Sequence, residues 1–158
     1  MIFLYNDIKY FIMDGFDQKI LMRLQQNARI SYTELGKQIG LSGPAVKERV
    51  HKLEENGFIE GYRAKLNLSK LGYTLTVIIN FKMNPGSIKQ FIEKLKGMPE
   101  VIECNRITGG DNLIMKVILK ENEELETLIN TLIEYGVPTT SVVLSTPIED
   151  RIIDLTGI

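Results

Sequence analysis

The chain has 158 residues, of which 44% are apolar and 25% are charged, enough to bury one core or two small ones. Its formal net charge of −1 excludes a uniformly basic nucleic-acid coat, yet residues 1–84 carry 12 Lys/Arg against 8 Asp/Glu, whereas residues 85–158 carry 7 against 12. The single cysteine, Cys104, excludes an internal disulfide framework and a cysteine-cluster zinc site, and no apolar run approaches the roughly 20 residues of a membrane span.

The first segment, residues 1–13, begins with the apolar and aromatic run MIFLYNDIKYFI. This run lacks the basic start and the unbroken apolar centre of a signal peptide. We predict an N-terminal extension that packs on the body of the protein or on a neighbouring subunit, because an exposed apolar tail would promote aggregation.

A first helix is predicted from Asp14 or Asp17, either of which can cap it, to about residues 27–28. Its apolar stripe would consist of Phe16, Ile20, Leu21 and Leu24. We expect this helix to pack under the two helices that follow it.

The next segment, residues 31–57, indicates two short helices joined by a tight turn. Ser31 and Glu34 have the spacing of a capping box, and Gly40 can end the first helix in a left-handed conformation. Ser42 can cap the second helix, and Pro44 suits its first turn, where a missing N–H costs nothing. The pattern is that of a helix-turn-helix, whose second helix can enter the DNA major groove, within a predicted domain of residues 14–60.

Residues 61–73 are predicted to be a connecting strand or hinge, with a turn at its end. Residues 74–150 then contain an internal repeat in which strand–helix–strand occurs twice. This order predicts an α+β protein whose second domain is a ferredoxin-like βαββαβ unit with both helices on one face of an antiparallel sheet. The other face would need a partner, which indicates dimerisation, and residues 151–158 would form a C-terminal tail.

The helix-turn-helix is the candidate nucleic-acid site. Residues 29–52 contain five Lys/Arg against two Glu, so the local charge is +3. Cationic side chains can pair with phosphates, and the N-terminus of the second helix adds partial positive charge. An ordinary three-helix bundle with a charged surface is the alternative. The candidate DNA-binding residues are Ser31, Tyr32, Ser42, Gly43, Pro44, Ala45, Lys47, Arg49 and Lys52.

A second motif, residues 108–112, lies between the second and third predicted strands. Its glycines allow close backbone approach, and its Asp and Asn can hydrogen-bond a ligand. The same residue types also suit an ordinary hairpin turn. The candidate ligand-binding residues are Gly109, Gly110, Asp111 and Asn112.

The sequence contains few groups of residues that could act together in catalysis. The only histidine, His51, has no evident nucleophile or carboxylate partner and is expected on the surface of the second helix of the pair. The acidic run at residues 121–126 fits the start of a helix, where carboxylates favour the helix dipole. We predict no catalytic residues, no metal site and no cofactor.

The sequence resembles the Lrp/AsnC family, the feast/famine transcriptional regulators of bacteria and archaea, over about residues 14–150. The resemblance rests on an ordered series of short matches, at residues 17–21, 28–31, 34–36, 40–42, 45–46, 49–50, 53–59, 61–62, 71–72, 99–101 and 108–109.

The resemblance implies a winged-type DNA-binding domain, a connecting strand and a ligand-sensing domain. It implies homodimers that often assemble into octamers, double-stranded DNA as a partner, and a small amino acid as effector near residues 109–112. The family commonly has Gly-Asp-Tyr-Asp in that loop, whereas this chain has Gly-Gly-Asp-Asn.

We therefore expect an amino-acid-responsive transcriptional regulator in the cytoplasm. One alternative is an enzyme of the same build that resembles sirohaem decarboxylases. The position of the single histidine argues against it, because that chemistry would use histidines and arginines around a tetrapyrrole. The other alternative is a ligand-sensing module that does not bind DNA.

Overall fold

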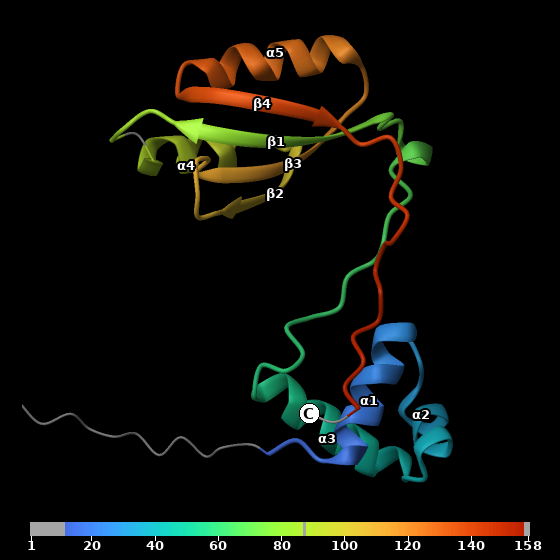
Figure 1. Ribbon diagram of the computed structural model, residues 1–158. Helices are drawn as coiled ribbons and strands as arrows, with labels where there is room; N and C mark the ends of the chain where they lie inside the picture. The colour runs from blue at the N-terminus through green and yellow to red at the C-terminus, as the bar shows by residue number, and fades with distance from the viewer. Residues whose placement is uncertain (1–11, 87, 157–158) are drawn as a thin grey trace, which may run out of the picture. The chain divides into compact units, whose positions relative to one another are not determined.

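The protein, seen here as a computed structural model that describes residues 12–86 and 88–156, forms two compact units (Figure 1). One unit contains the described residues up to Ala64 together with the segment that begins at Ile148. The other unit is Lys65–Pro147. Residues 1–11 of the predicted extension lie outside the described residues.

Three helices build the first unit, and each begins at a residue that caps it. Helix α1 (Gly15–Gln26) has a reciprocal capping box, in which Asp14 accepts from the Asp17 N–H and Asp17 accepts from the Asp14 N–H. Helices α2 (Tyr32–Ile39) and α3 (Gly43–Glu55) begin after Ser31 and Ser42, whose hydroxyls accept from backbone N–H groups. The predicted box at Ser31 is only half formed, because the Glu34 carboxylate accepts from Gln38 instead.

The core of this unit contains most of the residues that the helical periodicity indicated. Its fully or nearly fully buried members are Ile20, Leu24, Leu35, Ile39, Val46, Val50 and Leu53. Phe16, predicted in the apolar stripe of α1, is instead 37% exposed and lies against cationic side chains. It occupies the first turn of α1, where its ring meets Lys19 and Arg49 and not the core.

The turn between α2 and α3 depends on two glycines. Gly40 has a φ of 80°, the left-handed conformation that the sequence predicted for the end of the helix. Gly36 is required for a different reason, because a Cβ there would overlap the carbonyl oxygen of Leu41. The close approach of that carbonyl lets the chain fold back directly into α3.

The connector after α3 has no strand between Phe58 and Leu68, so the predicted strand is not formed within this chain. A short 3-10 helix, Ser69–Leu71, precedes Gly72, which turns the chain with a φ of 88°.

The second unit is a four-stranded antiparallel sheet with strand order β2-β3-β1-β4, as predicted for a βαββαβ unit. Its elements in chain order are β1 (Leu75–Met83), α4 (Ile88–Lys96), β2 (Val101–Arg106), β3 (Leu113–Leu119), α5 (Asn122–Ile133) and β4 (Gly136–Val142).

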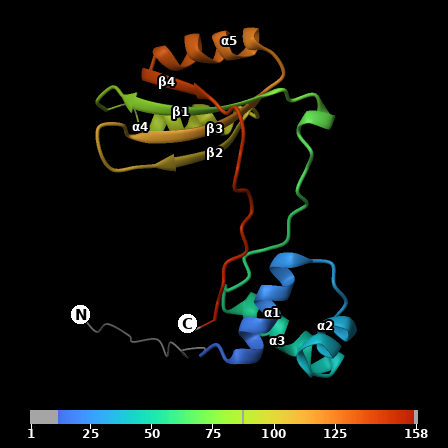
Figure 2. The same ribbon diagram turned by 45° about the vertical axis from the view of Figure 1, so that its right-hand side comes forward.

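The two faces of this sheet differ. Helices α4 and α5 cover one face (Figure 2), where Phe81 of β1 stacks on Phe91 of α4 with ring centroids 4.6 Å apart. On the opposite face most side chains of β1 and β3 are only half-buried, among them Ile78 and Ile114, although Ile118 is buried. The alternation of burial along β1 is that of a strand with one packed and one open face.

Candidate DNA interface and ligand site

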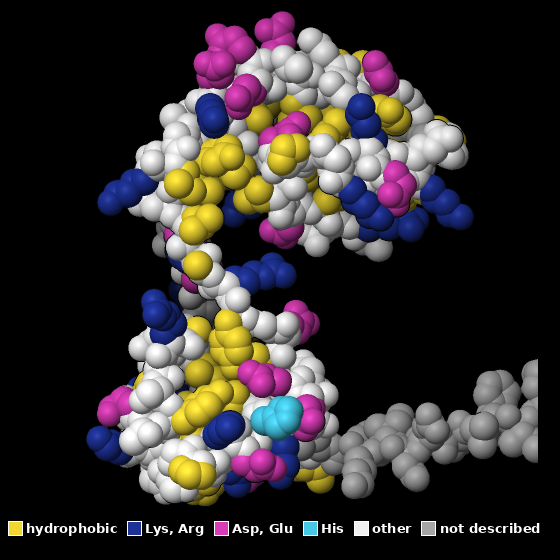
Figure 3. Space-filling model, turned by 180° about the vertical axis from the view of Figure 1, so that it is seen from behind, with side chains coloured by type: hydrophobic (Ala, Val, Ile, Leu, Met, Phe, Trp, Pro, Cys, Tyr) yellow, Lys and Arg dark blue, Asp and Glu magenta, His cyan; other side chains and the backbone are white. Residues whose placement is uncertain are grey.

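Helix α3 presents a mixed charged surface on the side away from the core. Val46, Val50 and Leu53 are buried, which leaves Lys47, Glu48, His51 and Lys52 exposed. Figure 3 shows basic and acidic side chains intermixed around the histidine of this unit. The surface is therefore less cationic than the sequence count alone indicates.

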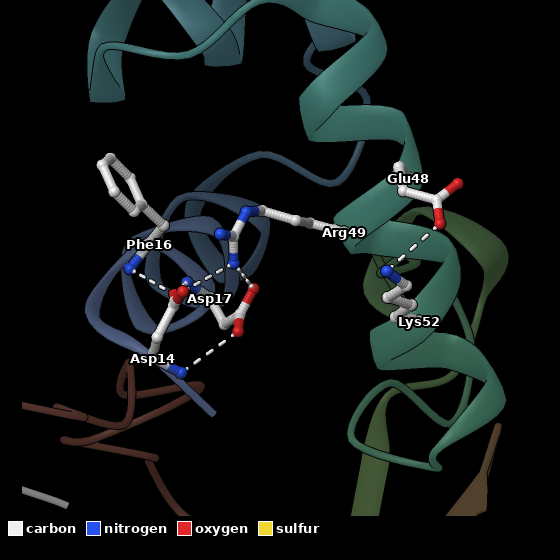
Figure 4. Close-up of polar contacts among 6 residues, drawn as sticks. All are labelled: Asp14, Phe16, Asp17, Glu48, Arg49 and Lys52. Carbon is white, nitrogen blue, oxygen red and sulfur yellow. Dashed lines mark hydrogen bonds and ion pairs between the residues drawn. The ribbon is translucent and has the colours of Figure 1, made fainter. Parts of the chain in front are cut away.

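Arg49 points in a different direction, toward the start of α1 (Figure 4). Its Nη1 lies 2.8 Å from Oδ1 of Asp17 and 2.9 Å from Oδ2 of Asp14. The guanidinium carbon is 5.4 Å from the centroid of the Phe16 ring, within range of a cation–π contact. The hydrogen bond to Asp17 is the main cause that raises the pKa of Arg49, so the group stays cationic.

Burial explains why Arg49 takes this position. The Asp17 side chain is only 3% exposed, and a carboxylate taken out of water needs an opposite charge and hydrogen bonds. The sequence predicts Arg49 as a DNA contact, but its guanidinium binds two carboxylates of its own chain. This arrangement gives it the role of fastening α3 to α1.

The other predicted cations fall into two groups. Lys52 pairs with Glu48 at 3.2 Å, and Lys37 lies 4.0 Å from Glu34, both on exposed surface. Lys47 makes no ion pair with any residue that the structure describes. Lys47 is thus the predicted contact on α3 whose charge is most available to a phosphate.

A hollow of about 470 Å³ lies beside Lys47 on the exposed side of α3. It brings together residues from α2 and α3, namely Tyr32, Pro44, Lys47, Glu48, His51 and Glu54. Three of these were predicted DNA contacts, whereas Glu48, His51 and Glu54 were not. The helical spacing 44, 47, 48, 51 could have indicated this set, because those positions share one face.

The remaining predicted DNA contacts stabilise the backbone at the starts of α2 and α3. Ser31 and Ser42 use their hydroxyls as caps, and Gly43 lies against Thr33, where a Cβ would come 3.2 Å from the hydroxyl oxygen. Ala45 is half-buried and its N–H donates to Ser42. Together they place the N-terminus of α3 at the surface with its first turn capped.

Tyr62, in the connector, is tied to the end of α3. Its hydroxyl donates to Oε1 of Glu54 over 3.0 Å. Partial burial, followed by that hydrogen bond and the nearby negative charge, raises the pKa of Tyr62 to about 12. The contact joins the first residues after α3 to the hollow.

The loop of the sheet unit that was predicted to bind a ligand has one residue in a structural role. The Asn112 side-chain oxygen accepts from the Met83 N–H at 2.7 Å, and the Asn112 N–H donates to the Phe81 carbonyl at 2.9 Å. Gly109 has a φ of 115°, and Asp111 is half-buried with no hydrogen bond or ion pair to any described residue. Asp111 is therefore the side chain of this loop that is available to a ligand.

A cavity of about 490 Å³ lies at the other end of β3 from this loop. Its lining combines apolar side chains with four glutamates and one lysine, and consists of Tyr73, Met98, Pro99, Glu100, Ile118, Leu119, Lys120, Glu121, Glu123, Glu124, Thr127, Leu128 and Thr131. None of the four predicted ligand-binding residues lines it. Because β3 has seven residues, the two places are separated by roughly 20 Å along the strand.

Over the described part of the chain, no three His, Cys, Asp or Glu side chains are grouped to hold a metal ion. No helix in that part is both long and apolar enough to cross a membrane.

Two family models match successive parts of the chain. Residues 13–54 match the AsnC-type helix-turn-helix domain, and residues 76–153 match the Lrp/AsnC ligand binding domain. The chain belongs to the Lrp/AsnC family. It is a helix-turn-helix transcriptional regulator with a separate ligand-binding domain, as the resemblance in the sequence implied.

Relatives within the Lrp/AsnC family match over most of their length. The chain is 43% identical to an uncharacterised helix-turn-helix transcriptional regulator, YezC of Bacillus subtilis, over 84% of this chain and 94% of that one. Among solved structures, LrpC of B. subtilis superposes with a TM-score of 0.84 at 30% identity, covering 89% and 100% of the two chains. A Neisseria meningitidis regulator in complex with L-Met shares the fold, with a TM-score of 0.86 at 23% identity over 92% and 98%.

Proposed function

We propose that this Lrp/AsnC protein binds double-stranded DNA through the exposed side of α2 and α3 and changes its DNA binding in response to an amino acid. The observation that carries the DNA part is the hollow beside Lys47, where a cation with no ion pair to the described residues, an aromatic side chain and a capped helix start occur together. Helix N-termini and lysines bind phosphate, and side chains on the first turns of a recognition helix reach base edges.

The DNA contacts in this proposal are Tyr32, Pro44 and Lys47, with His51 on the next turn of α3. Lys52 contributes less charge because it is paired with Glu48. Arg49 affects DNA binding indirectly, because it holds α3 against α1. The backbone N–H groups near Ser42 and Gly43 complete the phosphate site.

Selection of duplexes from a random pool tests the DNA part without knowledge of the operator. The protein should enrich a near-palindromic sequence, because a two-fold dimer places two copies of α3 on two half-sites. If no sequence is enriched and no duplex is bound at low salt, the protein is better described as a ligand-sensing module that does not bind DNA.

We further propose that two copies pair through the open face of the sheet and that such dimers assemble further, with an octamer as the expected assembly. Half-buried Ile78 and Ile114 support this, because a second surface that covers them would remove their apolar area from water. Sedimentation should give a dimer or a multiple of it for the purified protein.

The proposed effector is a small amino acid bound near Gly109, Gly110 and Asp111. The match to a ligand-binding domain and the L-Met complex of a structural neighbour support this class of ligand. Asp111 supplies a carboxylate that can pair with an amino group. Asn112 contributes by holding the loop, because its side chain is bonded to the end of β1.

A thermal-shift panel of the amino acids tests the effector site with two variants. Asp111→Ala should remove the shift given by the responding amino acid, whereas Glu121→Gln, in the lining of the acidic cavity, should retain it. The opposite pattern would show that the effector binds in the cavity at the far end of β3.

A regulatory and not a catalytic role is part of the same proposal, and the cytoplasm is where such a regulator would meet DNA. His51 supports it, because it lies on the exposed face of α3 with Glu55 at 3.5 Å, a position suited to DNA. Sirohaem decarboxylation by the purified protein would overturn the proposal.

A further inference from the structure

The chain returns to the helical unit after β4. That strand lies in the sheet unit, yet the segment that begins at Ile148 belongs to the same compact unit as α1, α2 and α3. We call residues 148–156 the C-terminal strap. The two units are therefore joined by two covalent paths, the connector after α3 and the strap (Figure 1).

The strap is held by the side chain of Gln25, in the last turn of α1. The Ile153 N–H donates to Oε1 of Gln25 at 2.8 Å, and Nε2 of Gln25 donates to the Ile153 carbonyl at 3.2 Å. One amide thus satisfies both backbone groups of a single residue, as a neighbouring strand would. Only Asn and Gln side chains carry both a donor and an acceptor in this arrangement.

The strap has a defined local conformation on both sides of this contact. Asp150 has a φ of 46°, which is uncommon for a residue other than glycine. Asp154 accepts from both the N–H and the hydroxyl of Thr156, at 2.9 and 2.8 Å. Leu155 is half-buried, so the strap also removes apolar surface from water.

Helix α1 connects the strap to the recognition helix. Gln25 lies in its last turn, and its first turn and cap carry the Asp17 and Asp14 carboxylates that bind Arg49 of α3. A helix transmits displacement along its length as a rigid element. Force on the strap therefore reaches α3 without passing through the connector.

We propose that the C-terminal strap docks on α1 as a second tether that restrains the DNA-binding unit, so that changes in the sheet unit are transmitted to α3 through Gln25 and Arg49. The docking itself is independent of DNA, whereas its consequence for DNA binding rests on the proposed function.

Hydrogen–deuterium exchange of the full-length protein tests the docking. Peptides that contain Ile153 should exchange slowly in the parent protein and at the rate of an unstructured chain in Gln25→Ala. Gln26→Ala is the matched control, because Gln26 is the adjacent amide and bonds only to Arg23 in its own helix among the described contacts. Unprotected Ile153 in the parent protein, or equal protection in Gln25→Ala, would overturn the proposal.

The consequence is tested with a selected duplex that carries two half-sites and with a second duplex that carries one. Loss of the tether should weaken binding to the two-half-site duplex by roughly three- to tenfold in Gln25→Ala, because a less preorganised pair of units loses more entropy on binding. Binding to the single half-site should stay unchanged in both variants. If the parent protein binds neither duplex, the proposed function is wrong. The exchange experiment then still shows whether the strap docks on α1. Equal two-site affinity in parent and Gln25→Ala would refute the tether's effect on DNA binding.

Discussion

Nη1 of Arg49 lies 2.8 Å from Oδ1 of Asp17, so a cation of α3 neutralises a carboxylate that is almost fully buried at the start of α1. Asp14 shares the same guanidinium and caps the same helix. The guanidinium thereby links the start of α1 to the middle of α3.

Removal of this guanidinium should destabilise the helical unit. Arg49→Ala leaves the Asp17 carboxylate buried without its partner, and we expect a loss of about 1.5–3 kcal/mol in the free energy of unfolding of that unit. Urea titration followed by exchange at α1 measures it. Lys52→Ala is the control and should change that free energy by less than about 1 kcal/mol, because its pair with Glu48 is exposed.

The same cluster predicts an acid-sensitive unit. The N–H of Asp17, together with Arg49, holds the pKa of Asp14 below its ordinary value of 3.8. Stabilisation from a carboxylate with a lowered pKa is complete above that value and is lost as the pH falls through the lowered pKa. Unfolding of the parent protein should therefore become easier below about pH 4. Asp14→Asn should show a flatter dependence in this range, and identical slopes would contradict the assignment.

The phenol of Tyr62 should ionise at a higher pH than that of an ordinary tyrosine. Its pKa of about 12 predicts that an absorbance titration of the phenolates, compared between the parent protein and Tyr62→Phe, will differ only near that pH while the protein remains folded. Because the folded pKa is raised, the contribution of Tyr62 to stability is present below pH 10 and is lost as the pH rises toward 12. A difference curve centred at the ordinary value would show that the bond to Glu54 is absent in solution.

Gly36 should not tolerate a side chain. A Cβ there overlaps the Leu41 carbonyl oxygen, and forcing the turn open should cost about 1–3 kcal/mol in Gly36→Ala. Gly15→Ala is the matched control, because no atom lies within 4 Å of a Cβ at that helical position. Thermal unfolding of the two variants separates them, and equal midpoints would show that the turn relaxes without cost.

The sequence predicted those features that depend on near neighbours along the chain. The caps at Ser31 and Ser42 and the left-handed Gly40 are such local signals, and the strand–helix–strand repeat indicated the order of the second unit. The side-chain pairing of Arg49 was not predicted, because it depends on how α1 crosses α3. Its partners are 32 and 35 residues away in the chain.

The two candidate ligand sites, the loop at residues 109–112 and the acidic cavity, were also predicted only where the signal was local in sequence. Residue types marked the loop at residues 109–112, but they did not separate the structural role of Asn112 from the available carboxylate of Asp111. The acidic cavity was missed because its lining comes from three separate segments of the chain. The acidic run at residues 121–126 was the available signal, and it was assigned to the start of α5 alone.

The salt dependence of DNA affinity tests the central claim most directly. On a selected duplex, the logarithm of the affinity should fall linearly with the logarithm of salt concentration, and Lys47→Ala should reduce the slope by about 0.9 for each phosphate that the Lys47 ammonium neutralises. Arg49→Ala should bind less tightly with the slope of the parent protein, because its guanidinium is held by Asp14 and Asp17. Salt-independent binding, or a slope reduced by Arg49→Ala and unchanged by Lys47→Ala, would contradict the account.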